Sequence, residues 1–201
     1  MTYYISDTHF GHVGIIRSCE RPFETAEEMD ASLILNWNSR VKPKDNVYIL
    51  GDMFCRHKDP DSVLKRLKGK KYLILGNHDA SWLKEDRRAY FESIADYLRI
   101  NDGKSVITMC QYPMVTYYYG LRENSFMVHG HIHNNTDADY FPLLAKRENV
   151  LNAGVEVNGY MPVTFEELKI NNDLFKEVYL ENTSYKERAD QCLSEFLNKW
   201  Q

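Results

Sequence analysis

The sequence of 201 residues predicts a single α/β domain. Over the first two-thirds of the chain, short apolar runs rich in β-branched, aromatic or leucine residues alternate with helical patterns. Gly, Asp or Asn follows most of these runs within two residues, as is typical at the ends of strands. No linker, repeat or low-complexity tract divides the chain, and its length suits one sizeable core.

The apolar runs are expected to form strands because they are short and end at turn-forming residues. Five such strands are expected, at Tyr3–Ile5, Val47–Leu50, Tyr72–Leu75, Val106–Met109 and Phe126–Val128.

Helices are expected where capping residues precede apolar stripes. Thr25 and Glu28 form a capping-box pattern before an apolar stripe, and Thr164 with Glu167 repeats the pattern. Asp59 followed by Pro60 suits the start of another helix, which Gly69 would end. A last amphipathic helix is expected at about residues 184–200, packed onto the domain core or, alternatively, against a second subunit.

Composition excludes several protein classes. No apolar stretch is long enough to cross a bilayer, and the N-terminus lacks the pattern of a signal peptide, so a cytoplasmic protein without a membrane partner is expected. The four cysteines form no CxxC pair, which argues against a disulfide framework. A net charge of -4 disfavours a long nucleic acid as partner but permits a small phosphorylated substrate, because bound cations reverse local charge.

Residues that can bind metals follow the expected strands. They come after all five strands, at the carboxyl ends where α/β sheets gather their functional sites. In chain order, the five strands are followed by Asp7 and His9, by Asp52, by Asn77 and His78, by Gln111, and by His131 and His133. Residues i and i+2 of an extended segment point the same way, so the first pair can share one ion, as can the last. An Asp/His/Asn ligand set suits Mn²⁺, Fe²⁺ or Zn²⁺, and a carboxylate such as Asp52 can bridge two ions.

The motifs Asp7-Thr8-His9, Gly51-Asp52, Gly76-Asn77-His78-Asp79 and Gly130-His131-Ile132-His133 together resemble the calcineurin-like metallophosphoesterase superfamily. The match spans residues 7–133 in the order of that family. The segments SDTHFGH, RPF at 21–23 and NWN at 36–38 resemble a small single-domain branch found in bacteria and phages.

The resemblance implies a four-layer αββα sandwich of two mixed β-sheets flanked by helices. It also implies two divalent ions, with Mn²⁺ expected first and Fe²⁺, Zn²⁺ or Mg²⁺ as alternatives. Asp7, His9, Asp52 and His133 would hold the first ion, and Asn77 and His131 would join the bridging Asp52 at the second. A water activated by both ions would hydrolyse a phosphomonoester or phosphodiester, with His78 as general acid and Asp79 orienting its ring.

Position 111 departs from the family pattern, in which a histidine precedes Tyr-Pro. Here the segment reads Cys110-Gln111-Tyr112-Pro113, and an amide oxygen is a weaker ligand than imidazole. Gln111 is therefore an uncertain ligand. The alternatives are a working enzyme with a weakened second site, a second site that prefers a harder ion, or a metal-binding module with little activity.

Three further residues are candidates for substrate binding. His12 lies in the loop that contains His9, and Tyr112 directly follows Gln111. Arg21 could clamp a phosphate or, alternatively, form a surface ion pair. A nucleotide phosphodiesterase or nuclease would require a base-stacking platform, such as the tyrosines at 117–119. The substrate and a monomeric or homodimeric state are left open.

Overall fold

The computed structural model describes residues 1–181, which form two four-stranded sheets. In the first sheet, β1 (Thr2–Ile5), β2 (Asn46–Leu50), β3 (Lys70–Ile74) and β4 (Ser93–Ala95) lie in this order and are all parallel. In the second, β5 (Tyr97–Asp102) is antiparallel to β6 (Ser105–Cys110), which is followed by parallel β7 (Ser125–His129) and β8 (Val150–Asn152).

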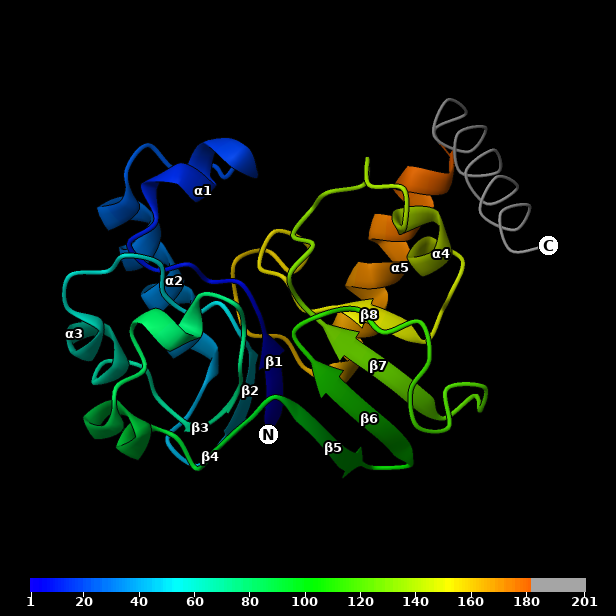
Figure 1. Ribbon diagram of the computed structural model, residues 1–201, viewed down its shortest axis with the longest axis horizontal. Coiled ribbons are helices and arrows are strands. Elements are labelled where there is room, and N and C mark those ends of the chain that lie inside the picture. Colours follow the sequence, from blue (N-terminus) through cyan, green and yellow to red (C-terminus); the bar gives the residue numbers. More distant parts are fainter. Residues whose placement is uncertain (182–201) are drawn as a thin grey trace.

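Helices cover the outer faces of the two sheets (Figure 1). Beside the first sheet lie α2 (Ala26–Arg40) and α3 (Pro60–Leu64), with α1 (Val13–Ser18) beyond the ends of its strands, and the second sheet carries α4 (Phe141–Ala145) and α5 (Phe165–Glu181). Two 3-10 turns, Asp79–Ser81 and Glu85–Tyr90, follow β3. The four-layer sandwich is thus confirmed, with one refinement: only the second sheet is mixed.

Alternating side chains along the strands build the layers, because successive residues of a strand face opposite sides. On β1, Tyr3 and Ile5 join the core beneath α1–α3, whereas Tyr4 joins the core between the sheets. On β7, Val128 faces the core between the sheets and Met127 faces the core beneath α4 and α5. Both sheets therefore have an apolar core on each face, apart from the exposed edge strand β5.

The helix-start predictions are confirmed at the described positions. Thr25 accepts a hydrogen bond from the backbone N–H of Glu28, and Asp59 accepts one from Ser62. At α5 the capping box is reciprocal, because Thr164 donates from its backbone N–H to Glu167 and accepts one in return. The helix starting at Pro60 is shorter than expected, and it ends at Leu64 rather than near Gly69.

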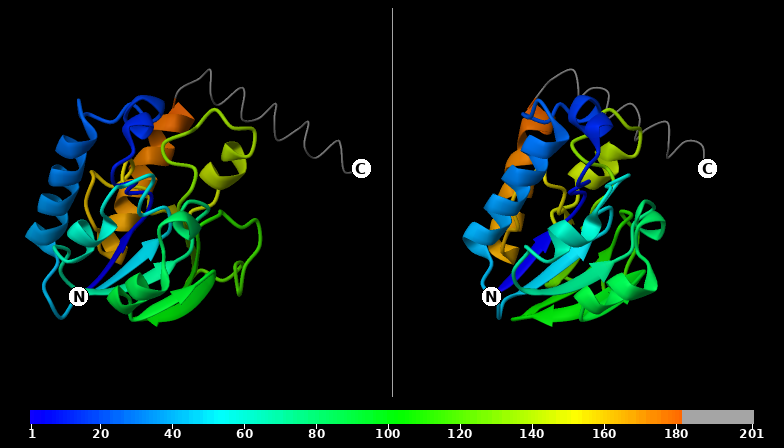
Figure 2. Two further views of the ribbon diagram at one scale, coloured as in Figure 1. Left: turned by 60° about the vertical axis from the view of Figure 1, so that its left-hand side comes forward. Right: turned by 90° about the vertical axis from the view of Figure 1, so that its left-hand side faces the viewer.

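All strands except the antiparallel β5 run toward the end of the molecule that carries α1, opposite the N-terminus (Figures 1 and 2). A parallel bridge between Ser6 and Gly154 links the end of β1 to the segment after β8. The polar residues after β1, β2, β3, β6 and β7 consequently meet in one region.

The terminal helix expected at residues 184–200 lies outside the described residues. Within residues 1–181, no helix has the length and apolar character needed to span a bilayer.

Candidate metal centre

Asp7 joins the loops of both sheets. One oxygen of its carboxylate accepts a hydrogen bond from the backbone N–H of His131 at 2.9 Å, and the other accepts one from Nε2 of Gln111 at 3.0 Å. The backbone N–H of Gly130 donates to the carbonyl of Gln111, which connects the ends of β6 and β7. The residue after the first strand thus fixes the loops of β6 and β7 around a common centre.

The backbone of most expected ligands lies in the left-handed region. The φ values are 56° at Asp7, 49° at His9, 51° at Asp52, 71° at His131 and 51° at His133. This region is sparsely populated by residues other than glycine, and such strain concentrates at active sites and ligand clamps. Five strained positions converging on one centre indicate that the loops are held for function.

Two glycines allow the loops to approach closely. A Cβ at Gly130 would collide with the side chains of Ser6 and Asp7, and one at Gly76 would collide with Asp52. Any other residue would therefore push the loops of β3 and β7 away from the candidate ligands.

His9 lies at the middle of the centre. Its ring centroid is 5.1 Å from that of His133 and 5.2 Å from that of His78, and its Nε2 lies 3.8 Å from the Asp52 carboxylate. Donor atoms of Asp7, His9 and His133 lie within 4.8 Å of one another. The structure thus brings together the four residues expected at the first metal ion.

Asp79 organises the loops after β2 and β3. Its buried carboxylate accepts hydrogen bonds from the backbone N–H groups of Asp52, Met53 and Gly76 and from the indole of Trp82. These hydrogen-bond partners of Asp79 differ from the expected one, the ring of His78. The backbone N–H of His78 donates instead to Asp52 at 2.8 Å, so Asp79 holds the Asp52 loop and Asp52 positions the His78 backbone.

Arg21 takes a different place from the one expected. It is 4% exposed, and its guanidinium donates to the Glu156 carboxylate and to the backbone carbonyls of Asp7 and Thr8. These contacts occupy its donors, so the predictions of a phosphate clamp or a surface ion pair are wrong. Arg21 instead holds the Asp7 backbone and forms a buried ion pair.

Glu156 links this ion pair to a candidate ligand, and the sequence reasoning missed it. Nδ1 of His133 donates to its carboxylate at 2.9 Å, and such partners orient the rings of metal-binding histidines. A signal existed, because Glu156 is the only charged residue between Glu148 and Glu166. A lone acid in an apolar stretch is rarely buried without a partner.

Burial and neighbouring charges move the pKa values of the ligand groups apart. Burial raises the pKa of Asp7 to about 6 and lowers the pKa of His9 to about 2. Burial also acts to lower the pKa of His133, but hydrogen bonds with Cys19 and Glu156 and the charge of Asp7 outweigh it and raise that pKa to about 10. His9 is accordingly a neutral imidazole, the form that binds metals.

Buried polar atoms without hydrogen-bond partners indicate that these residues fit a cation. Within residues 1–181, both ring nitrogens of His9, Oε1 of Gln111 and Oε2 of Glu156 are buried without a hydrogen-bond partner. Leaving such atoms unpaired costs about 1–3 kcal/mol each, so several in one place indicate a missing ligand. The mixed nitrogen and oxygen donors suit a divalent ion.

The remaining candidates lie around this centre. Asn77 and His131 are exposed on the rim, Tyr112 is 46% exposed, and its ring centroid is 4.7 Å from that of His131. Gln111 is fully buried, with its amide nitrogen already bonded to Asp7. The ring of half-buried His12 lies 5.4 Å from that of His9.

Two tyrosines of the run, Tyr118 and Tyr119, lie on the surface in contact with two arginines. The Arg99 guanidinium lies 3.8 Å from the ring centroid of Tyr118, which lies 3.8 Å from that of Tyr119, and Arg122 covers Tyr119 at 3.7 Å. Tyr118 and Tyr119 thus contact each other and one arginine each, while 41% of Tyr118 and 43% of Tyr119 stay exposed. Tyr117 is buried.

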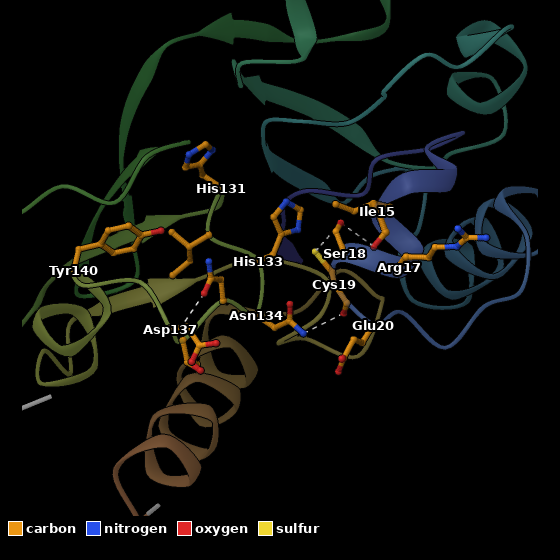
Figure 3. A pocket seen from close by; sticks show the side chains of 13 residues that line it. Ile15, Arg17, Ser18, Cys19, Glu20, His131, His133, Asn134, Asp137 and Tyr140 are labelled. Carbon is orange, nitrogen blue, oxygen red and sulfur yellow. Dashed lines mark hydrogen bonds between the residues drawn. The ribbon is translucent and has the colours of Figure 1, made fainter. Parts of the chain in front are cut away.

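A cavity of about 690 Å³ lies beside His131 and His133 (Figure 3). The end of α1 contributes Arg17 and Ser18 to one side, and Asp137 and Tyr140 lie on the other. Its lining is mostly polar, which suits a hydrophilic ligand next to the candidate metal centre.

Comparisons with known proteins agree with this geometry. The family described as calcineurin-like phosphoesterase matches residues 2–192. An uncharacterized protein of Methanocaldococcus jannaschii is 35% identical over 167 residues, covering 82% of this chain and 86% of that protein. The gene 66 protein of Mycobacterium phage L5 is 28% identical over 161 residues, 66% of this chain and 77% of that protein. The crystal structure of AQ665, a protein of unknown function from Aquifex aeolicus, has a TM-score of 0.66 and 30% identity, covering 85% of this chain and 98% of that chain.

Proposed function

We propose that this chain, which belongs to the calcineurin-like phosphoesterase family, hydrolyses the phosphate ester of a small substrate with the aid of two divalent cations. The observation that carries the proposal is the state of His9. Within the described part of the chain its two buried nitrogens lack hydrogen-bond partners, yet the ring lies among Asp7, Asp52 and His133. A neutral imidazole surrounded by carboxylates and a second imidazole is a site prepared for a cation.

Seven residues would hold the cations. Asp7, His9, Asp52 and His133 would bind the first, and Asp52 would be shared with a second held by Asn77, His131 and Gln111. When bound, the divalent cations supply activation of water and neutralisation of charge on the phosphoryl oxygens. Mn²⁺ suits this ligand set best, with Fe²⁺, Zn²⁺ and Mg²⁺ as further candidates.

His78 would protonate the leaving group. Its ring lies 5.2 Å from that of His9 at the centre, and its backbone is fixed by the hydrogen bond to Asp52. An imidazole at this position can deliver a proton to the ester oxygen as the bond to phosphorus breaks. His12, whose ring lies 6.5 Å from that of His78, faces the same region and is a candidate for substrate contact.

The cavity beside His131 and His133 would receive the rest of the substrate. Its side chains include the hydroxyls of Ser18 and Tyr140 and the amide of Asn134, which bind hydroxyl or amide groups of a ligand. Since Arg17 is the one arginine or lysine in this lining and Glu20 and Asp137 are acidic, a polyanionic leaving group is disfavoured. A polar leaving group of low charge fits better.

The test is hydrolysis by protein stripped of metal and reloaded with Mn²⁺. Turnover is expected with p-nitrophenyl phosphate or its bis ester, and comparison of the two separates monoesterase from diesterase activity. Asp52→Asn should abolish turnover, whereas Asp61→Asn, which alters a surface ion pair with Arg87, should retain it. Stoichiometric metal binding without turnover of either ester, for any divalent ion, would favour a metal-binding module in which Gln111 has disabled the second site.

A further inference from the structure

A second group of metal-binding side chains adjoins the centre described above. Donor atoms of His9, His12 and Cys55 all lie within 4.8 Å of one another. His9 and Cys55 are buried and His12 is half-buried, so one side of the group is accessible to solvent. The phosphoesterase activity proposed above uses neither His12 nor Cys55 as a metal ligand.

Backbone pairing between two loops brings these residues together. Phe10 and Phe54 form a parallel bridge, and the backbone N–H of Cys55 donates to the carbonyl of Phe10 at 3.2 Å. The backbone N–H groups of His9 and Phe10 donate to Asp52 and Met53 in the same way. The backbones of the loops after β1 and β2 are therefore joined residue by residue, which keeps the three residues close together without a ligand.

Three of the four imidazole nitrogens of this group have no hydrogen-bond partner among the described residues. Within the described residues, Nδ1 of His12 is buried without a partner, as are both nitrogens of His9. A cation at the phosphoesterase centre would engage one nitrogen of His9. The unsatisfied nitrogen of His12 would then remain unexplained, although buried polar groups are almost always paired.

A neighbouring group of similar composition provides a contrast. Cys19, His133 and Glu156 also place donor atoms within 4.8 Å of one another. In that group, however, His133 and Glu156 already pair with each other and with Arg21, although Oε2 of Glu156 has no partner within residues 1–181. In the described part of the chain, the group containing Cys55 holds more unpaired imidazole nitrogens and is the better candidate for a further cation.

We propose that His9, His12 and Cys55 form a zinc-binding site, and that its occupation inhibits the enzyme. Two imidazoles and a thiolate are typical zinc ligands, whereas Mg²⁺ and Mn²⁺ prefer oxygen donors. Three protein ligands leave a fourth position for water, on the accessible side of His12. A neutral imidazole has a single lone pair for coordination, so His9 serves either the zinc site or the phosphoesterase centre. The inhibition rests on the proposed function, but the zinc binding does not.

Binding is tested by spectroscopy, independently of activity. Co²⁺ bound at this site should give a near-ultraviolet charge-transfer band from the Cys55 thiolate, and added Zn²⁺ should remove it. Cys55→Ser should abolish the band, while the matched variants Cys19→Ser and Cys110→Ser should keep it. Absence of the band from the unsubstituted protein would overturn the site, and so would a band lost in Cys19→Ser but kept in Cys55→Ser. Thermal melting establishes that each variant is folded.

Inhibition is tested on the protein loaded with Mn²⁺. Zn²⁺ should inhibit ester hydrolysis, and added Mn²⁺ should relieve it, because both ions need His9. In Cys55→Ser, the zinc concentration for half-inhibition should rise about tenfold or more, since loss of supporting groups alone weakens metal sites by about 10–100-fold. An unchanged zinc concentration in this variant would contradict the inhibitory role. A protein without hydrolytic activity would refute the proposed function but leave the cobalt measurement decisive for binding.

Discussion

Nδ1 of His133 donates a hydrogen bond to the carboxylate of Glu156 at 2.9 Å, and the same carboxylate is paired with buried Arg21. Arg21 in turn donates to the backbone carbonyl of Asp7. Two candidate ligands that are 126 positions apart, residues 7 and 133, are thus fixed by one buried network. Its polar groups restrain both the ring of His133 and the strained backbone of Asp7.

Glu156→Gln is expected to weaken metal binding by about 10–100-fold, because the ring of His133 loses its anionic partner. The variant should also unfold more easily, by about 3–5 kcal/mol, because Arg21 is left buried without its counter-charge. Isothermal titration with Mn²⁺ and chemical denaturation measure the two effects. The double variant Arg21→Met, Glu156→Gln should recover part of the stability but not the affinity. Unchanged affinity in both variants would show that the network is structural only.

His78→Ala is expected to reduce turnover by about 10²–10⁴-fold while the metal content stays constant. The reason is that its side chain would supply the proton, whereas its backbone N–H, which the substitution retains, makes the bond to Asp52. Steady-state kinetics and elemental analysis of the same preparation check this. Loss of metal from the variant would identify His78 as a ligand instead.

Asp79→Asn should disrupt the metal site, whereas His78→Ala should lower turnover alone. An amide cannot accept all four hydrogen bonds that the carboxylate accepts from the Asp52 and Gly76 loops and from Trp82. We expect lower stability, by about 1–3 kcal/mol or more, and reduced metal content. If the variant instead retained metal and stability and lost only turnover, the primary role of Asp79 would be to orient the general acid.

Gln111→His is expected to lower the Mn²⁺ concentration needed for half-maximal activity, because imidazole is a stronger ligand than an amide oxygen. The ring can also retain a donor toward Asp7, which Gln111 now provides. Gln111→Ala is the matched control, and it should raise that concentration. A metal-activation curve that is the same in all three proteins would mean that position 111 does not contribute to the second site.

Lys176 makes stability depend on pH. It is buried on α5, it donates to the carbonyls of Arg147 and Val150, and burial lowers its pKa to about 8. Between pH 8 and the usual lysine pKa of 10.5, Lys176 carries a proton in the unfolded chain but not in the folded one. The contribution of Lys176 to the free energy of unfolding therefore rises with pH. Between pH 7.5 and 10.5, the free energy of unfolding of the native protein should rise by on the order of 3 kcal/mol more than that of Lys176→Met. A difference in unfolding free energy that is constant over this range would contradict the assignment.

The expected ligands could be predicted because they follow strands whose apolar patterns are clear. The five strands expected from those patterns are all present, and the residues after them converge. The shorter elements could not be predicted: α1 and α4 have six and five residues, which is too few to display a helical period, and β8 has three. Edge strand β5 alternates exposed and half-buried residues, so it carries no apolar run.

The roles of Arg21 and Glu156 could not be predicted for a different reason. They are separated by 135 positions, and the pairing depends on how the segment after β8 returns to β1. Asp79 is adjacent to His78 in sequence, but the 3-10 turn that begins there directs its carboxylate beneath the Asp52 loop. The adjacency of Asp79 and His78 in the sequence therefore predicted a contact between them, whereas the backbone geometry directs Asp79 to the Asp52 loop.

The central claim, that these residues form a two-metal centre, is tested most directly by metal stoichiometry. Equilibrium dialysis of metal-stripped protein against Mn²⁺ should give about two ions per chain. Asp52→Asn should lower this value to one or fewer, because Asp52 would contribute to both ions, and Asp61→Asn should leave it unchanged. Equal Mn²⁺ binding by the native protein and Asp52→Asn, or no binding by the native protein, would contradict the account.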